Sequence, residues 1–290
     1  GFFCSACFMQ VGYSQVYTDT TSLVADLEAG IFEEYILAPA SVTDTFFIGK
    51  MVSVGNSFIL KAQDGLGFKP VVTGNPDDKP SYLFSVEDVN GGADIKLEGI
   101  HFVSEIRGEE AINNGTMRVF SENVNITVQS CNFVDFPSYN AIAKIYNSGG
   151  DITLDSVLVN NCSGKIIQVN YKDDDDTPNY VPLIGDVKIT NSTFSNIYKR
   201  IFFELGAGNV PIDENDPDLT QRFNAGAESF TIDHCTFYHH IDVDLMQGRS
   251  LYEFAGHAAI KNNLTITNTI FARMGKNMAA DSASNTIMGH

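Results

Sequence analysis

The chain has no tryptophan and only 18 basic residues against 36 acidic ones, which gives a formal net charge of −18 over 290 residues. This shortage of positive charge argues against nonspecific nucleic-acid binding and against docking on an anionic membrane surface. No apolar run has the length of a transmembrane helix, so we expect no integral membrane segment. Hydrophobic residues still make up 43% of the chain, which is enough for a full core.

Cysteine is also scarce. The five cysteines are odd in number and irregularly spaced, so they imply no disulfide framework. Two of them lie in the opening stretch Gly1–Met9, GFFCSACFM, which has two alternative interpretations. It is either the end of a signal peptide, with Cys7 as the lipidated residue of a bacterial lipoprotein, or a first strand or expression remnant. The first alternative predicts a bacterial protein that is secreted or anchored to the outer surface.

An eight-residue pattern recurs six times along the chain. Its first and third positions are apolar in every copy, its fifth is Gly, Ser, Asn or His, and its eighth is Phe in five copies and Val in one. The copies, called octets below, are Ile95–Phe102 (IKLEGIHF), Ile126–Phe133 (ITVQSCNF), Ile152–Val159 (ITLDSVLV), Val187–Phe194 (VKITNSTF), Phe230–Phe237 (FTIDHCTF) and Leu264–Phe271 (LTITNTIF).

The octet predicts a strand, a bend and a second strand. Alternating apolar residues indicate a half-buried strand, and a small or amide residue at position five suits a sharp left-handed bend. The pattern is constant while the spacing between copies varies, which is typical of a β-solenoid whose connections differ in length. A β-sandwich also has many short strands, but it does not repeat one side chain at one place in every unit. We therefore expect octets stacked about 4.8 Å apart, with ladders of apolar, aromatic and bend residues.

The ends of a solenoid need caps. Residues 21–29, TSLVADLEA, place Leu23, Val24 and Leu27 on one helical face before Gly30, and this predicts an N-terminal capping helix. The predicted organisation is an N-terminal segment, 1–20, and one β-helix domain, 21–290. The runs that predict the first strands are 45–48, 57–60 and 70–73.

The repeat Ile-x-Ile-x-Asn-Ser/Cys-Thr-Phe resembles the β-helix of the pectin-lyase-like superfamily over about residues 40–275. The segments Tyr35–Pro39 and Phe58–Asp64 look like the usual opening of such helices. The chain is similar to uncharacterised secreted β-helix proteins of polysaccharide-degrading gut bacteria. The resemblance implies an all-β fold, a right-handed single-stranded parallel β-helix with an N-terminal capping helix. The superfamily includes lyases, glycoside hydrolases, esterases and noncatalytic adhesins, so the fold does not fix the reaction.

Family motifs that would name a reaction are missing. The chain lacks the Asn-Thr-Asp, His-Gly and Arg-Ile-Lys signatures of polygalacturonase-type hydrolases and the Trp-Ile-Asp-His stretch of classical pectate lyases. No catalytic residue is carried over, and if the chain is an enzyme, lyase chemistry is favoured over glycoside hydrolysis. Three functions stay open: a monomer that binds or processes an acidic polysaccharide, a lyase acting on uronate polymers, and a noncatalytic surface or adhesion scaffold.

Basic residues begin successive second strands and supply the candidate binding site. If they align, like charges stacked about 5 Å apart repel by about 0.8 kcal/mol each in bulk water, which favours an anionic ligand such as a polyuronate. The alternative is that each base pairs with an acid or that the register slips by one residue, so that Lys199 partners Lys165. The substrate-binding candidates are Arg118, Lys144, Lys165, Lys199, Arg200 and Arg249, with the rings of Tyr171 and Tyr198 available to stack on sugars.

The acidic run Lys172–Asp176 lies in a long predicted connection between strands. Carboxylate clusters hold calcium, which makes Asp173, Asp174, Asp175 and Asp176 candidate ligands of a calcium cofactor. A solvated charged loop is the alternative, because the run has no recognisable ligand spacing.

Overall fold

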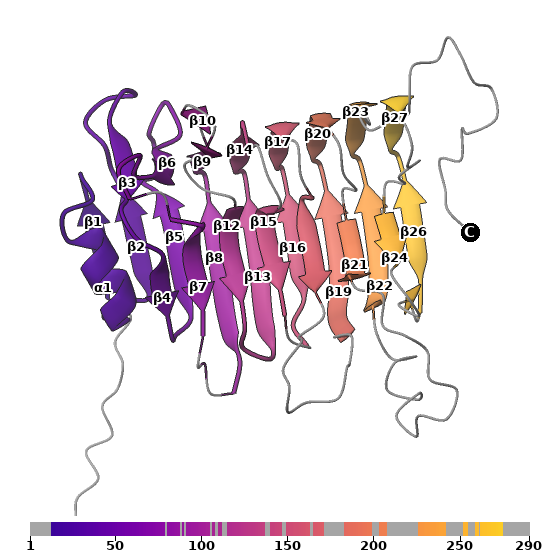
Figure 1. Cartoon of the computed structure of the whole chain (residues 1–290), viewed down its shortest axis with the longest axis horizontal. Helices are drawn as coiled ribbons and strands as arrows, with labels where there is room; N and C mark the ends of the chain where they lie inside the picture. The colour runs from indigo at the N-terminus through magenta and orange to yellow at the C-terminus, as the bar shows by residue number, and fades with distance from the viewer. Residues whose placement is uncertain are drawn as a thin grey trace, which may run out of the picture.

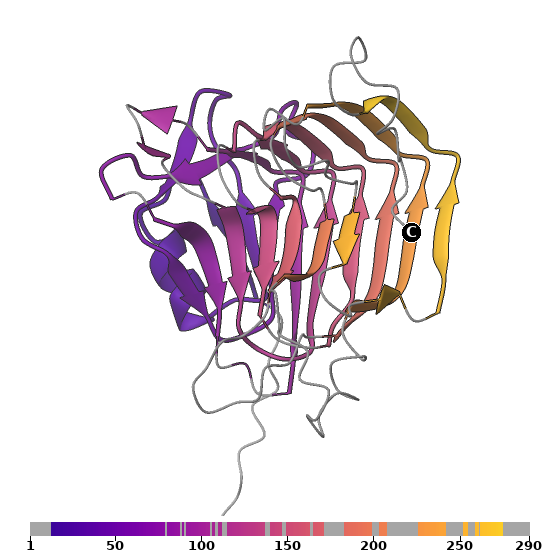
Figure 2. The same cartoon turned by 45° about the vertical axis from the view of Figure 1, so that its right-hand side comes forward.

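The structure, a computed structural model, places most of the chain in three parallel β-sheets that the polypeptide visits in rotation. We name them sheets A, B and C, and we call one passage through all three a coil. Figure 1 shows the coils following one another in sequence order along the long axis, and Figure 2 shows the same stack obliquely. The residues that the structure describes are 13–78, 80–87, 89, 91–104, 106–107, 110–111, 115–136, 140–146, 149–162, 165–170, 183–198, 203–207, 226–241, 252–254, 259–260 and 262–274.

The strands of each sheet follow chain order in space. Sheet A contains β1 (Ser14–Tyr17), β2 (Glu34–Leu37), β5 (Phe58–Ala62), β8 (Ala93–Glu98), β13 (Val124–Gln129), β16 (Ile152–Asp155), β19 (Leu183–Thr190), β22 (Gly226–Asp233), β25 (Ala259–Ile260) and β26 (Leu264–Thr267). Sheet B contains β3 (Thr45–Ile48), β6 (Val71–Gly74), β9 (His101–Val103), β14 (Asn132–Val134), β17 (Leu158–Cys162), β20 (Thr193–Tyr198), β23 (Thr236–Ile241) and β27 (Ile270–Met274). Sheet C contains β4 (Val52–Val54), β7 (Tyr82–Val86), β12 (Gly115–Val119), β15 (Asn140–Ile145), β18 (Ile167–Asn170), β21 (Phe203–Ala207) and β24 (Tyr252–Phe254). A short antiparallel ribbon of β10 (Ile106–Arg107) and β11 (Glu110–Ala111) follows β9.

The six octets lie directly above one another, as the sequence predicts. In sheet A, Ile95 pairs with Ile126 and Ile126 with Ile152, and the same register continues through β19, β22 and β26. The pairing is parallel in all three sheets, which excludes the antiparallel sandwich. The runs predicted as first strands also form strands, namely β3, β5 and β6.

Octet side chains form the core in vertical ladders. Phe102 stacks on Phe133 with ring centroids 5.1 Å apart, and Phe194 stacks on Phe237 at 4.9 Å. Val159 lies between these two pairs and is also fully buried. Burying one such side chain contributes about 1.5–3 kcal/mol, so the repeat itself supplies much of the hydrophobic stabilisation.

The fifth octet position adopts the left-handed backbone conformation in every copy. This conformation costs most residues about 1–2 kcal/mol, whereas Gly has no such penalty and Asn tolerates it comparatively well. The conserved geometry explains why the position is restricted to small, amide or imidazole side chains. The φ angles are 70° at Gly99, 53° at Ser130, 57° at Ser156, 52° at Asn191, 52° at His234 and 48° at Asn268.

A helix covers the N-terminal end of the stack, where Figure 1 shows it beside β1 and β2. This helix, α1 (Leu23–Ala29), lies within the predicted segment 21–29, and Leu23 and Leu27 are buried. Gly30 ends it with a φ of 59°, a conformation that favours glycine. The strand β1 precedes the helix and pairs with β2, so sheet A begins within 1–20, which the sequence predicts as a separate N-terminal segment.

Candidate functional site

Two of the predicted basic residues share a register position on sheet C, because Arg118 in β12 pairs with Lys144 in β15. The next strand places Gln168 beside Lys144, and Lys165 lies three residues earlier, where its carbonyl accepts a hydrogen bond from the Ala141 amide. The predicted continuation of the basic column through Lys165 is therefore wrong. The register position is occupied in turn by Ser53, Ser85, Arg118, Lys144, Gln168, Glu204 and Glu253.

The misplacement of Lys165 has a physical cause. Ile166 and Ile167, which follow it, are both buried, so the strict alternation of inward and outward residues fails at this point. Counting outward positions from Lys165 by twos then gives the wrong face of the strand. The side chain of Lys165 is itself buried, with a relative exposure of 6%.

Several other candidates lie outside the residues that the structure describes, and their roles stay predictions. Tyr198 has its backbone in β20 of sheet B, which is a different sheet from that of Arg118. Within the described part of the chain, no group of three or more His, Cys, Asp or Glu side chains is arranged to hold a metal ion. The candidates outside the described residues are Tyr171, Lys199, Arg200, Arg249 and the proposed calcium ligands Asp173, Asp174, Asp175 and Asp176.

Arg118 and Lys144 form the centre of a polar and aromatic cluster on the outside of sheet C. Both side chains point away from the core, because the residues on either side of each are buried in it. Their outward neighbours along the strands are Phe120 and Tyr146, one on each coil. We call the cluster formed by these residues and by the buried residues that begin β7 and β15 the sheet C face: Tyr82, Arg118, Phe120, Asn140, Lys144 and Tyr146.

Aromatic rings hold both cations in place on the sheet C face. Arg118 Cζ lies 4.5 Å from the ring centroid of Phe120 and 5.6 Å from that of Tyr82. Lys144 Nζ lies 4.8 Å from the ring centroid of Tyr146. The rings of Phe120 and Tyr146 stack on each other at 4.6 Å with an interplanar angle of 9°. Each cation–π contact contributes about 0.5–2 kcal/mol, depending on its exposure to solvent.

The sheet C face also contains polar atoms that lack partners. Asn140 is fully buried, and its Nδ2 donates to Tyr82 Oη at 2.8 Å. Among the described residues, Asn140 Oδ1 and Arg118 Nε are buried without any hydrogen-bond partner. An unsatisfied buried polar group costs about 1–3 kcal/mol, so these two atoms reduce the stability of the fold. Burial raises the pKa of the Tyr82 phenol, which therefore stays neutral at physiological pH.

An acidic residue lies close to the sheet C face without forming an ion pair with its cations: Glu87 accepts a hydrogen bond from Ser85, the register partner of Arg118. Within the part of the chain that the structure describes, neither Arg118 nor Lys144 forms an ion pair, although acidic residues outnumber basic ones two to one in the sequence. Adjacent like charges repel, and the pair remains side by side. The arrangement can attract an anionic group and can offer it charge-assisted hydrogen bonds.

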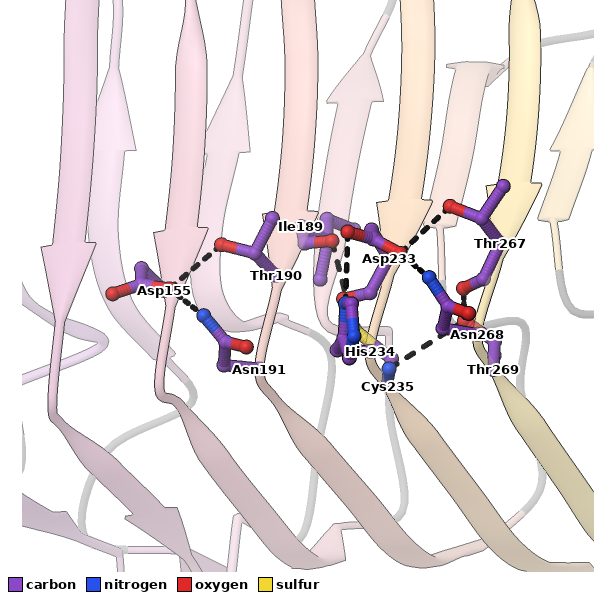
Figure 3. Close-up of polar contacts among 10 residues, drawn as sticks. All are labelled: Asp155, Ile189, Thr190, Asn191, Asp233, His234, Cys235, Thr267, Asn268 and Thr269. Carbon is purple, nitrogen blue, oxygen red and sulfur yellow. Dashed lines mark hydrogen bonds and ion pairs between the residues drawn. The ribbon is translucent and has the colours of Figure 1, made fainter.

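The bend between sheets A and B carries a second polar cluster, which Figure 3 shows. Asp155 Oδ1 accepts hydrogen bonds from Thr190 Oγ1 at 2.7 Å and from Asn191 Nδ2 at 2.8 Å, both on the next coil. These donors hold the pKa of Asp155 below its ordinary value, because they stabilise the ionised carboxylate. The cluster therefore links two coils at the bend.

The same arrangement recurs two coils later. Asp233 Oδ1 accepts from Thr267 Oγ1 at 2.7 Å and from Asn268 Nδ2 at 2.9 Å, while His234 Nδ1 lies 2.9 Å from Asp233 Oδ2. These contacts lower the pKa of Asp233 to about 2. Both carboxylates have their hydrogen bonds within the protein, so this bend ladder stabilises the stack and offers little to a ligand. His234 belongs to the bend, as the sequence predicts.

Sequence reasoning missed the aromatic partners of the two cations. The sequences Arg118-Val-Phe120 and Lys144-Ile-Tyr146 both read base, apolar residue, aromatic ring, and the two bases pair in register. This shared sequence pattern could have predicted the contacts between each base and its ring, because residues two apart on a strand lie on the same face. Asn140 and Tyr82 gave no such signal, since their contact joins positions 58 residues apart.

Two comparisons with known proteins assign no family to the chain. No protein-family model matches the chain, and a search of curated proteins finds no match either. Among the residues that the structure describes, no helix has both the length and the hydrophobicity needed to cross a bilayer.

Proposed function

We propose that the chain is a right-handed parallel β-helix of the pectin-lyase-like type, and that it binds or processes an acidic polysaccharide through the sheet C face. The rotation of the chain through three parallel sheets supports the β-helix assignment. Right-handedness is supported by the general rule that connections between parallel strands are right-handed in roughly 98% of cases.

The observation that carries the functional proposal is the pair of neighbouring cations beside stacked rings, neither of which forms an ion pair with any residue that the structure describes. A uronate carboxylate would take hydrogen bonds from the guanidinium of Arg118 or the ammonium of Lys144. The face of a sugar ring would pack on Tyr146 or Phe120, whose stacked rings are half-buried.

A location outside the cytoplasm follows from this proposal, because acidic polysaccharides of this class are extracellular or cell-surface polymers. We propose a secreted or outer-surface protein that acts as a monomer.

Binding to a panel of soluble polymers tests the proposal. We expect polygalacturonate or alginate to bind in isothermal titration calorimetry and an uncharged dextran not to bind. Arg118→Gln with Lys144→Gln should weaken binding at least 10-fold, because both charges are removed while side-chain volume is largely kept. The matched control is Lys50→Gln, which removes an exposed lysine that pairs with Glu28 at 2.8 Å and should leave affinity unchanged.

The alternatives are outcomes of the same experiment. A rise in ultraviolet absorbance during incubation with a uronate polymer, dependent on Arg118 or Lys144, would assign a lyase, because β-elimination leaves an unsaturated sugar. Failure of every acidic polymer to bind would remove the polysaccharide proposal and favour the noncatalytic scaffold.

A further inference from the structure

A second cluster of polar side chains lies on the outside of sheet B, on a different sheet from the sheet C face. It joins Lys69, two residues before β6, to His101 in β9 and Asn132 in β14, and Figure 1 shows these three strands side by side. His101 and Asn132 are register partners. Lys69 Nζ donates to Asn132 Oδ1 at 2.7 Å, and Asn132 Nδ2 lies 3.3 Å from His101 Nδ1.

The two contacts fix the protonation of His101. A lysine ammonium can only donate, so the side-chain oxygen of Asn132 must face Lys69 and the amide nitrogen must face His101. The amide nitrogen is itself a donor, which requires His101 Nδ1 to be the acceptor. The imidazole proton therefore lies on Nε2, and Asn132 holds His101 as a neutral donor beside Lys69.

The cluster of Lys69, His101 and Asn132 contains a cationic side chain and no acidic side chain of its own. All three side chains are half-buried, and burial lowers the pKa of Lys69 and of His101. The charge of Lys69 lowers the pKa of His101 further, while Asp135 opposes this effect. Among the described residues, Lys69 forms no ion pair with a carboxylate.

We propose that Lys69, His101 and Asn132 form a second ligand site that binds a single oxyanion, namely a carboxylate or a sulfate group. Lys69 supplies the charge and the remaining N–H donors, and His101 Nε2–H supplies a neutral donor. Asn132 positions both, because its two amide atoms are engaged by them. Such a site recognises the acidic substituent of a sugar or of a small metabolite by the same chemistry.

Titration with simple anions tests this site directly. The probes are sodium sulfate and sodium acetate at constant ionic strength, with sodium chloride as the balancing salt, and the readout is the imidazole resonance of His101 in NMR spectra. We expect a saturable shift with sulfate, acetate or both, which also identifies the preferred group. Saturation should raise the pKa of His101 relative to chloride, because a bound anion favours the imidazolium form.

Matched variants separate a site from a general charge effect. Lys69→Met should weaken anion binding at least 10-fold, and Lys69→Arg should retain it in part. Lys96→Met is the control, because Lys96 is a lysine already paired with Glu98 at 2.7 Å. Thermal denaturation confirms that each variant is folded.

Two results would overturn this proposal. One is a linear, unsaturated shift of His101 that Lys69→Met does not change. The other is selective reductive alkylation of Lys69 by an aldehyde with no saturable anion binding, which would assign Lys69 as a neutral, reactive amine. The double variant of Arg118 and Lys144 should bind these anions normally, so failure here and failure of the sheet C face are distinguishable.

Discussion

The bend between sheets A and B and the sheet C face differ in whether their polar groups have hydrogen-bond partners. At the bend, Asp155 and Asp233 each receive hydrogen bonds from the Thr and Asn of the following coil. On the sheet C face, Arg118 Nε and Asn140 Oδ1 are buried without partners among the described residues. Both regions are built on stacked strands, so the stacking itself does not explain the difference.

The difference indicates which region serves the fold and which is free for a ligand. Satisfied polar groups at the bend stabilise the contact between coils and leave little capacity for other partners. Unsatisfied groups on the sheet C face reduce stability, while the charged ends of Arg118 and Lys144 have no ion-pair partner among the described residues and can take a ligand. Substitutions at the bend should therefore change stability, whereas substitutions on the sheet C face should change binding.

The largest effect is expected from the aromatic ladder that underlies the bend. Phe194→Ala removes a fully buried ring that stacks on Phe237, and it should lower the free energy of unfolding by about 3–5 kcal/mol. Urea denaturation followed by circular dichroism measures the change. Phe47→Ala is the control, because Phe47 is 45% exposed and its removal should cost much less. Equal losses in the two variants would contradict the assignment of the ladder to the core.

Two substitutions at one position of the left-handed bend should change the stability of the protein in opposite directions. Ser156 has a φ of 57°, so the β-branched side chain in Ser156→Val should cost about 2 kcal/mol. Ser156→Gly removes the steric penalty at some cost in chain entropy and should stabilise the protein by about 0.5 kcal/mol. Thermal denaturation of both variants provides the test, and a loss of stability in the glycine variant would contradict a strained bend.

The bend ladder should also give stability a dependence on pH. Hydrogen bonds from Thr190 and Asn191 hold the pKa of Asp155 below its ordinary value, so the carboxylate form is favoured in the folded state. Its stabilisation is present above the ordinary pKa of about 3.9 and is lost as pH falls through the lowered folded-state pKa. Asp155→Asn should therefore cost about 1 kcal/mol at pH 7 and progressively less below about pH 4.

Urea denaturation at pH 7 and at pH 3 measures that difference. The control is Asp64→Asn, because Asp64 is an exposed residue in the turn after β5. A difference between wild type and Asp155→Asn that stays constant down to pH 3 would argue against the ladder as its source.

The smallest change in stability is expected on the sheet C face. Arg118→Met keeps an unbranched chain against Phe120 and removes the unpartnered Nε, so the free energy of unfolding should change by less than about 1 kcal/mol. Binding of an acidic polymer should nevertheless be lost at least 10-fold. Calorimetric titration and urea denaturation of the same sample give both numbers, and a loss of stability above about 2 kcal/mol would assign Arg118 to the fold.

The two regions also differ in how far the sequence predicts them. The octets have the same residue type at the same place in each coil, so their stacking, their bend and the phenylalanine ladder could all be predicted from sequence. Sheet C has no such regularity, because consecutive buried residues such as Ile166 and Ile167 interrupt the alternation. Lys165 was therefore misplaced, whereas Arg118 and Lys144 were correctly aligned. The contact between Asn140 and Tyr82 depends on the folded stack and leaves no local pattern.

Determination of the structure with a bound oligogalacturonate tests the central claim most directly, because it reports where the ligand lies. The proposed function predicts a carboxylate within hydrogen-bonding distance of Arg118 or Lys144 and a sugar ring packed on Tyr146 or Phe120. An oligosaccharide bound on another surface, with the sheet C face left empty, would contradict it.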